Sequence, residues 1–313
     1  MKLSLVATLH RSAPHLLEFH ERAGAAARRL AGDDYEIVLV NDGSPDDSLD
    51  LAVDLSKRDP RVVVVDLSRN FGHHKAIMTG LSHAHGERIF LIDSDLEEEP
   101  EWLMPFAEQM EREQCDVVYG VQEARRGGWF ERASGHWFYF FLNRLIGLDI
   151  PANMMTARLM TRPYVDALLL HEEREVFLAG LFHLTGFVQR PRFVKKHSTS
   201  RTTYTLRRKL GLVLDSVTSF SAFPLIAIFY LGIAIFLLAG GYASYLLARW
   251  MVYSNAVSGW TSMMISIWLL GGMITCFIGI VGMYLSKVFS ETKRRPYTIV
   301  RRVYGRESQP RPR

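Results

Sequence analysis

The chain has 313 residues, a formal net charge of +4 and two cysteines. This length accommodates one sizeable α/β domain with an appended module. Because Cys115 lies beside a predicted strand and Cys276 lies inside an apolar run, the composition argues against a disulfide framework. The N-terminus has no apolar stretch followed by a small-residue cleavage site, so we expect no secretory signal and a cytoplasmic N-terminal region.

Short β-branched runs alternate with helical stretches in the first part of the chain. Strands are predicted at residues 2–8, 35–41, 62–66, 88–93 and 117–121, and helices at residues 16–30, 48–58, 75–85 and 102–114. This alternation is typical of a parallel sheet wrapped by crossover helices. Ligands of such sheets bind at the carboxyl ends of the strands, where this chain carries Asp42 and Asp93.

Two long uncharged runs follow, at residues 216–248 and 251–286. Each run exceeds the roughly 20 apolar residues that cross a bilayer. Basic residues occur before the first run at 207–209 and after the second at 287 and 293–295, whereas Arg249 alone separates the runs. By the positive-inside rule we expect a multi-pass protein of the inner (cytoplasmic) membrane, with two spans and with both termini cytoplasmic. The alternative is a buried helical pair in a soluble protein.

The predicted organisation has six parts. They are an α/β domain at 1–204, an amphipathic juxtamembrane helix at 205–222, a first span at 223–248, an extracytoplasmic loop at 249–260, a second span at 261–286 and a basic cytoplasmic tail at 287–313. The juxtamembrane helix lies in the interface plane or packs on the α/β domain. Between residues 287 and 313 there are nine Lys or Arg and two Glu, which favours an anionic partner. Because this tail adjoins the spans, lipid headgroups are preferred over nucleic acid.

Small residues in the two spans permit close helix packing. They include Gly240, Gly241, Gly271, Gly272, Gly279 and Gly282. This pattern is compatible with a homo-oligomer or with packing of the hairpin on itself.

Three carboxylates follow the fourth predicted strand at spacing i, i+2 and i+4. They are Asp93, Asp95 and Glu97. Such spacing at a strand end aims oxygen ligands at one hard cation, and Mg²⁺ or Mn²⁺ prefers carboxylates, waters and phosphate oxygens. A divalent ion there neutralises a diphosphate leaving group without proton transfer. The alternative is an ordinary surface turn, but the position after a central strand favours metal binding.

Several stretches, in this order and spacing, resemble one known family. They read YEIVLVNDGS at 35–44, SRNFG at 68–72, IDSDLE at 92–97, NRL at 143–145, RLM at 158–160, TSFS at 218–221 and RPY at 295–297. The chain is thereby similar to family 2 glycosyltransferases of GT-A fold, in the polyprenyl-phosphate branch that includes dolichyl-phosphate mannose synthase and bacterial GtrB-like undecaprenyl-phosphate sugar transferases. The resemblance implies a Rossmann-like domain followed by a transmembrane hairpin, and inverting transfer of one sugar to a polyprenyl phosphate for cell-envelope glycans.

The resemblance also implies roles for individual residues. The residues implied in donor binding are Thr8, His10, Asp42, Asp93, Ser94 and Asp95. Those implied to bind the metal, Mg²⁺ or Mn²⁺, are Asp93, Asp95 and Glu97. Contacts to the acceptor phosphate fall to Arg125, Arg132, Ser134, Arg158 and Arg201, because two phosphorylated partners need several cations. The implied catalytic residues are Asp93, Asp95, Thr156 and Arg158. The partners implied are a UDP- or GDP-sugar, the lipid phosphate and the membrane.

This chain departs from the family pattern at several positions. Asn41 replaces the first Asp of the Asp-Asp-Gly-Ser motif, and Thr156 stands where relatives often carry an Asp regarded as a catalytic base. A phosphate monoester has a second pKa near 6, so its oxygen is largely ionised at neutral pH and needs no base. We therefore expect activity without a carboxylate at position 156. The alternatives are a processive polysaccharide synthase and a non-catalytic membrane scaffold with a nucleotide-binding domain.

Adjacent histidines open the third predicted helix region. His73 and His74 precede Lys75, which suggests either a zinc site or a phosphate contact at a helix N-terminus. No third ligand is apparent in the sequence, so the phosphate contact is preferred.

Overall fold

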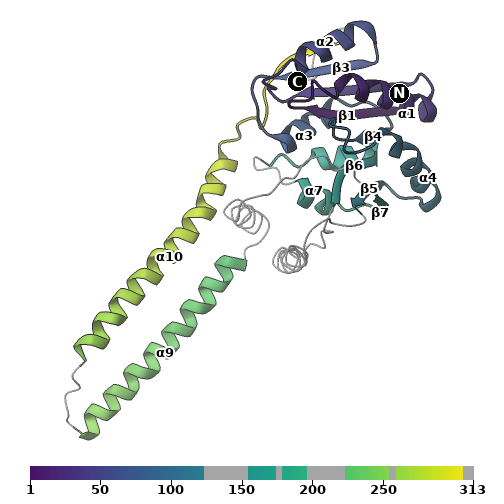
Figure 1. The fold of residues 1–313 in the computed structure, drawn as a ribbon. Helices are drawn as coiled ribbons and strands as arrows, with labels where there is room; N and C mark the ends of the chain where they lie inside the picture. Colours follow the sequence, from purple (N-terminus) through teal and green to yellow (C-terminus); the bar gives the residue numbers. More distant parts are fainter. Residues whose placement is uncertain (123–153, 174–177, 196–222, 254–258, 306–313) are drawn as a thin grey trace. The chain divides into compact units, whose positions relative to one another are not determined.

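The computed structural model describes residues 1–122, 154–173, 178–195, 223–253 and 259–305. One unit of the chain holds an eight-stranded sheet, and a second unit holds two long helices. The strand order is β7-β5-β6-β4-β1-β2-β3-β8 (Figure 1). The strands are β1 Leu3–Leu9, β2 Tyr35–Asn41, β3 Val62–Leu67, β4 Arg88–Leu91, β5 Val117–Gln122, β6 Met154–Thr161, β7 Gln189–Val194 and β8 Val300–Tyr304.

The five strands predicted from the sequence are present and run in the same direction, but the sheet also contains antiparallel strands that the sequence did not predict. Strands β1 to β4 pair in parallel, whereas β6 runs antiparallel to both β4 and β5, and β8 runs antiparallel to β3. Strand β7 pairs with β5 in parallel. The edge strands β7 and β8 carry several exposed cationic residues, so they lack the continuous apolar run that identifies a buried strand. The sheet is therefore mixed, with a parallel centre.

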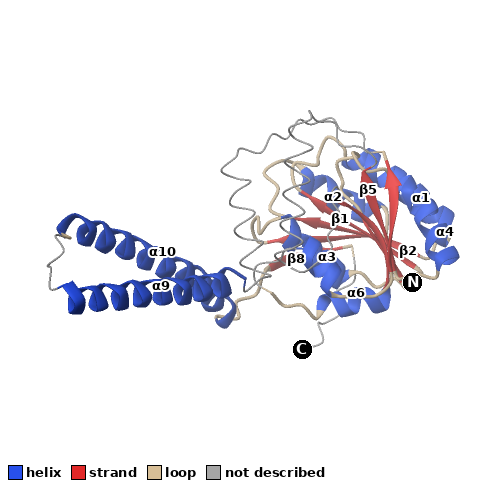
Figure 2. Ribbon diagram, turned by 90° about the horizontal axis from the view of Figure 1, so that it is seen from below, coloured by secondary structure: helices blue, strands red, loops and turns tan. Residues whose placement is uncertain are grey.

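Helices cover both faces of the sheet (Figure 2). One face is packed by α1 Leu16–Ala31, α2 Ser48–Arg58 and α4 Leu103–Glu113. The 3₁₀ turn η1 Pro100–Trp102 directly precedes α4. The other face is packed by α3 His73–His83, α6 Arg162–Leu169 and α7 Leu178–Leu184. Alternate residues of β1 serve the two faces: Leu5 lies in the first core and Val6 in the second. Two cores thus fix the central strands from both sides.

The C-terminal segment returns to this sheet. Strand β8 lies within the predicted tail at 287–313, and its approach is fixed by a backbone hydrogen bond from Ser68 N to Ile299 O of 2.9 Å. The Thr79 and Thr298 hydroxyls are 2.8 Å apart. Part of the predicted tail is therefore a strand of the α/β unit.

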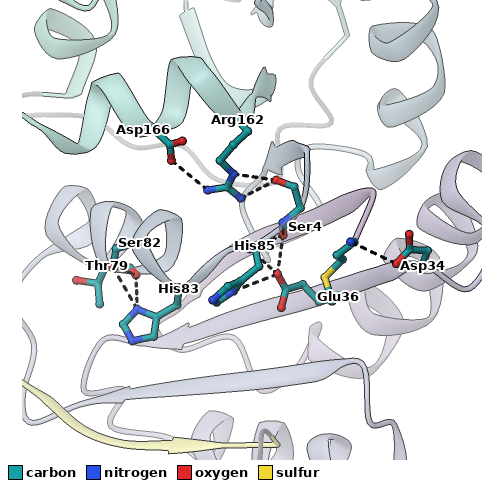
Figure 3. A network of polar contacts seen from close by, with 11 residues as sticks. Ser4, Asp34, Glu36, Thr79, Ser82, His83, His85, Arg162 and Asp166 are labelled. Carbon is teal, nitrogen blue, oxygen red and sulfur yellow. Dashed lines mark hydrogen bonds and ion pairs between the residues drawn. The ribbon is translucent and has the colours of Figure 1, made fainter. Parts of the chain in front are cut away.

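A buried carboxylate holds together the end of the sheet at which the central strand β4 begins (Figure 3). Glu36 is 1% exposed, and its Oε1 accepts hydrogen bonds from the Ser4 hydroxyl and from the His85 backbone amide, each at 2.7 Å. The Gly86 amide donates to Ser4 Oγ at 2.7 Å, while the Arg162 guanidinium donates to Gly86 O and lies 3.6 Å from Asp166. These contacts connect β1, β2, α6 and the turn before β4.

The second unit contains α9 Phe223–Tyr253 and α10 Trp260–Thr292. Within the described residues, Leu269–Thr292 is the one stretch long and apolar enough to cross a membrane, and Pro224–Ala239 is a shorter apolar stretch. Two spans therefore remain a prediction. An added Cβ at Gly271, Gly272, Gly279 or Gly282 would meet no atom within 4 Å. The predicted juxtamembrane helix at 205–222 lies outside the described residues.

Candidate active site

Side chains from β1, α3 and the segment after β4 converge where the central parallel strands end. Ser94, 4% exposed, donates to Thr8 O at 2.8 Å, and its hydroxyl is 2.9 Å from that of Ser12. Thr8 Oγ1 is 3.1 Å from Nδ1 of His73 at the start of α3. The ends of β1 and β4 are thus joined, as expected for neighbouring strands of a parallel sheet.

His73 extends this group to the predicted metal ligands. Its Nε2 lies 3.4 Å from Asp93 Oδ1, and the two side chains are 45% and 26% exposed. His73 is therefore an accessible bridge between Thr8 on β1 and Asp93 after β4. The sequence singled out this histidine as a phosphate contact and did not predict its contact with Asp93, because a separation of 20 residues carries no pairing signal.

The carboxylates after β4 do not form the predicted three-ligand cluster. Strand β4 ends at Leu91, and Leu96 adopts a left-handed φ of 59°, so the chain turns and the spacing of an extended strand no longer applies. Asp95 is exposed and its Oδ1 accepts from Glu97 N at 3.0 Å, whereas the Glu97 side chain is 9% exposed. In the described part of the chain, no three His, Cys, Asp or Glu side chains are placed to hold a metal together.

Asp93 and Asp95 nevertheless fit one kind of metal site. Mg²⁺ is usually held by one or two protein carboxylates, with substrate phosphates and waters completing its shell. Asp95 is exposed and Asp93 partly exposed at the same strand end, which suits an ion completed by substrate rather than by protein alone. The donor set thus fits the predicted ion with two protein ligands.

The loop after β2 is rigidly held. Asp42 is 3% exposed, and its two carboxylate oxygens accept from the amides of Phe71 at 2.7 Å and Gly72 at 3.0 Å. Gly43 has φ 57°, and an added Cβ would collide with the backbone of Arg69 and Asn70. The Asp42 side chain therefore fixes the segment that leads into α3. Its predicted role in donor binding stays a prediction.

Asn41, the departure from the family motif, has a structural explanation. Its amide Nδ2 donates to Asp66 Oδ1 at 2.8 Å, and its Oδ1 accepts from Ser44 N at 3.2 Å. Asp66 is 1% exposed and its other oxygen lies 3.7 Å from the Arg301 guanidinium on β8. An aspartate at position 41 would place two carboxylates in contact, which is unfavourable without a further cation. The amide at position 41 removes this repulsion.

Arg158 lies inside the protein. It is 1% exposed on β6, its Cζ is 3.3 Å from the centre of the Phe182 ring, and Nη2 donates to Met155 O at 3.2 Å. Burial lowers the pKa of Arg158 to about 10, against the electrostatic influence of Tyr164 and Glu98, so the side chain remains charged at neutral pH. The described residues thus show Arg158 in a packing role, and its predicted phosphate contact stays a prediction.

The remaining predicted residues divide into two groups. His10 is exposed just after β1, and Thr156 is half-buried on β6 with its amide donating to Glu98 Oε1 at 3.0 Å. Arg125, Arg132, Ser134 and Arg201 lie outside the described residues. Glu98, buried and in contact with the Asp93 and Thr156 amides, is a neighbour of these residues that the sequence did not single out. The only available signal was an acidic run after Asp95, which by itself is typical of a solvated turn.

Fold and site together define an α/β domain whose candidate ligand site lies at the carboxyl ends of the central strands. Residues 4–169 match glycosyl transferase family 2. The chain is 50% identical over 305 residues to a protein of Mycobacterium tuberculosis (strain CDC 1551 / Oshkosh) described as "Putative glycosyltransferases", covering 97% of this chain and 89% of that protein. It is 32% identical to the "Prophage bactoprenol glucosyl transferase homolog" of Escherichia coli (strain K12), covering 97% and 99% of the two chains.

A further relative is the "Bactoprenol glucosyl transferase" of Shigella phage SfV, 30% identical, with 96% of this chain and 98% of that protein covered. The family match spans more than half of the chain, and these relatives align over nearly its full length. The chain therefore belongs to glycosyl transferase family 2. The predicted Rossmann-like α/β fold is confirmed.

Proposed function

We propose that this protein transfers a single sugar, with inversion, from a nucleotide sugar to a polyprenyl phosphate at the cytoplasmic face of the membrane. The observation that carries the proposal is the joined ends of β1 and β4, where Asp93 is partly exposed beside His73 and Asp95 is exposed on the following turn. Full-length similarity to proteins named bactoprenol glucosyl transferase supports a lipid acceptor. The product would serve synthesis or modification of a cell-envelope glycan.

The donor would be a UDP- or GDP-sugar. A bound Mg²⁺ or Mn²⁺ would neutralise charge developing on the departing nucleoside diphosphate. Asp93 and Asp95 would hold that ion, and the amide-bound Asp42 would keep the loop leading to His73 in place. Thr8 and Ser94 lie at the same strand ends and His10 follows β1, and these three residues would line the donor pocket. In this scheme the protein contributes orientation and electrostatics.

The acceptor needs no strong base. A phosphate monoester with a second pKa near 6 is already largely dianionic at neutral pH and can attack the anomeric carbon directly. Thr156 is compatible with this chemistry because its backbone, rather than a side-chain carboxylate, makes the contacts that the structure gives. Arg125, Arg132, Ser134 and Arg201 are proposed to hold the lipid phosphate. We expect Thr156→Asp to alter the rate or the metal dependence, and we expect the wild type, with threonine at this position, to be active.

The membrane-capable stretch in α10 supports delivery of a lipid acceptor. We propose that α9 and α10 both cross the inner membrane, with the α/β domain and both termini on the cytoplasmic side. Basic residues between 287 and 313 would then lie next to anionic headgroups.

Purified full-length protein, undecaprenyl phosphate, Mn²⁺ and a panel of labelled UDP- and GDP-sugars test the proposal. A lipid carrying one sugar is expected with at least one donor, and Asp95→Ala should lower its formation about 100-fold or more. An alkali-stable polymer would instead indicate a processive synthase. The absence of transfer from every donor, in preparations shown to be folded, would indicate a non-catalytic scaffold.

A further inference from the structure

A buried glutamate connects the two segments that carry the predicted catalytic residues. Glu98 is 2% exposed; its Oε2 accepts from Asp93 N at 3.3 Å and its Oε1 accepts from Thr156 N at 3.0 Å. One carboxylate therefore spans from the segment after β4 to β6. We propose that Glu98 is a positioning residue that holds the Asp93–Asp95 turn in the geometry that binds a metal–diphosphate pair. This inference rests on the proposed function.

The turn that Glu98 holds has a conformation that needs support. Leu96 has φ 59°, which is uncommon for a leucine and persists where the surrounding structure enforces it. Two hydrogen bonds act on either side of Leu96: Asp95 Oδ1 accepts from Glu97 N at 3.0 Å, and Glu98 Oε2 accepts from Asp93 N. The turn thereby brings residue 98 back to residue 93. Loss of the Glu98 contact would free the backbone from which the Asp93 carboxylate projects.

The negative charge of Glu98 also matters. Its electrostatic influence raises the pKa of the buried Arg158, opposing the larger effect of burial. Arg158 in turn donates from Nε to Thr156 O at 3.3 Å and from Nη2 to Met155 O at 3.2 Å. Glu98 and Arg158, which carry opposite charges, thus both hydrogen-bond to the backbone of the same short segment of β6. A neutral glutamine cannot supply that charge, although it fills the same space.

Both Glu98 oxygens accept backbone hydrogen bonds in the protein interior, so the side chain is placed to orient other residues rather than to touch substrate. Residues that orient metal ligands commonly change metal affinity 10–100-fold when mutated. We therefore expect the Glu98 effect to appear in metal and nucleotide binding as well as in turnover.

The test compares Glu98→Gln and Glu98→Asp with wild type in the full-length protein. Glu98→Gln is expected to raise the Mn²⁺ concentration for half-maximal activity about tenfold or more, and to weaken Mn²⁺-dependent binding of UDP or GDP by a similar factor in calorimetry. Glu98→Asp keeps the charge but is one methylene shorter, so an intermediate change is expected. Thermal unfolding is recorded for each variant.

Glu101→Gln is the matched control. Glu101 also follows the Asp95 turn, but it is 46% exposed and pairs with Arg22 on α1 through hydrogen bonds of 2.9 and 2.8 Å. This variant removes one carboxylate charge from the same neighbourhood without touching Asp93 or Thr156. Its Mn²⁺ dependence should equal that of wild type, even if its thermal stability falls slightly.

The two proposals fail in different ways. Wild type that transfers no sugar but binds UDP or GDP with Mn²⁺ would refute the proposed function, and the binding comparison would still decide the role of Glu98. Unchanged Mn²⁺ and nucleotide affinities in Glu98→Gln, within twofold of wild type, would overturn the positioning role. So would a failure of wild type to bind either nucleotide with Mn²⁺. If Glu98→Gln does not fold, a wild-type metal dependence in Glu98→Asp would also count against the proposal.

Discussion

The two ends of β4 use the same device for different purposes. Before β4, the buried Glu36 accepts hydrogen bonds from Ser4 and from the His85 amide. After β4, the buried Glu98 accepts from the Asp93 and Thr156 amides. Each carboxylate fixes a turn by satisfying backbone donors that would be costly to bury without partners.

The surroundings of the two carboxylates differ. At the Glu36 end, the Arg162 guanidinium donates to Gly86 O, so the polar groups there bind one another and hold the turn in place (Figure 3). At the Glu98 end, Asp93 is partly exposed next to His73, and Asp95 is exposed. A buried carboxylate is therefore not a functional signal by itself. What distinguishes the second end is that the turn it holds presents accessible acidic side chains.

The largest effect is expected from removing a proposed metal ligand at the functional end. Asp95→Ala should lower sugar transfer about 100-fold or more, because charge on the departing diphosphate would lose a stabilising contact. A modest loss of thermal stability is also expected, because Asp95 is exposed but its Oδ1 accepts from Glu97 N in the Leu96 turn. Asp50→Ala, at an exposed position on α2, is the control and should transfer sugar as wild type does. Equal activity of the two variants would contradict a role for Asp95.

A change at the opposite end should affect stability instead. Glu36→Ala leaves the Ser4 hydroxyl without its carboxylate acceptor and leaves the His85 amide with the longer 3.0 Å contact to Ser4 Oγ, so a cost of about 2 kcal/mol in the free energy of unfolding is expected. Denaturant unfolding of the detergent-solubilised protein measures it. The Mn²⁺ concentration for half-maximal activity, assayed well below the unfolding midpoint, should match wild type. A shifted Mn²⁺ dependence would break the distinction between the two ends.

Asp66, which accepts a hydrogen bond from Asn41, is a third buried carboxylate to compare with Glu36 and Glu98. Asn41→Asp places two carboxylates at the 2.8 Å contact with Asp66, and a destabilisation of about 1–2 kcal/mol with weaker nucleotide binding is expected. The double variant Asn41→Asp with Asp66→Asn restores one amide and one carboxylate and should recover much of the loss. Additive losses in this double-mutant cycle would show that the two side chains do not interact.

The smallest effect concerns acid stability near the same loop. Burial would raise the pKa of Asp46, but hydrogen bonds from the Ser44 and Ser48 hydroxyls and the Ala13 amide lower it to about 2. Because the folded-state pKa is lowered from its ordinary value of 3.8, this contribution is complete above about pH 4 and disappears as the pH falls toward 2. The unfolding midpoints of wild type and Asp46→Asn should therefore converge in that window. A constant difference across it would exclude the titration of Asp46.

Sequence periodicity predicted the central strands well because they are buried on both faces and read as continuous apolar runs. Strand β2 was predicted as residues 35–41 and observed as Tyr35–Asn41. Strand β6 was missed because Thr156 and Arg158 interrupt its apolar run, and strands β7 and β8 were missed because their exposed arginines do the same. The predicted cluster of Asp93, Asp95 and Glu97 assumed an extended backbone, which the turn at Leu96 does not provide.

The sequence by itself determined the α/β class, the family and the strand end that carries the acidic residues, because these depend on local periodicity and motif order. Only the tertiary structure showed that Glu98 connects Asp93 with Thr156, that Asp66 accounts for Asn41, and that Arg158 is enclosed under Phe182. The Glu98–Asp93 contact depends on the turn at Leu96, and the other contacts join residues distant in the chain whose meeting depends on the fold. Hydrogen bonding and charge pairing act through space, so linear spacing carries no record of them.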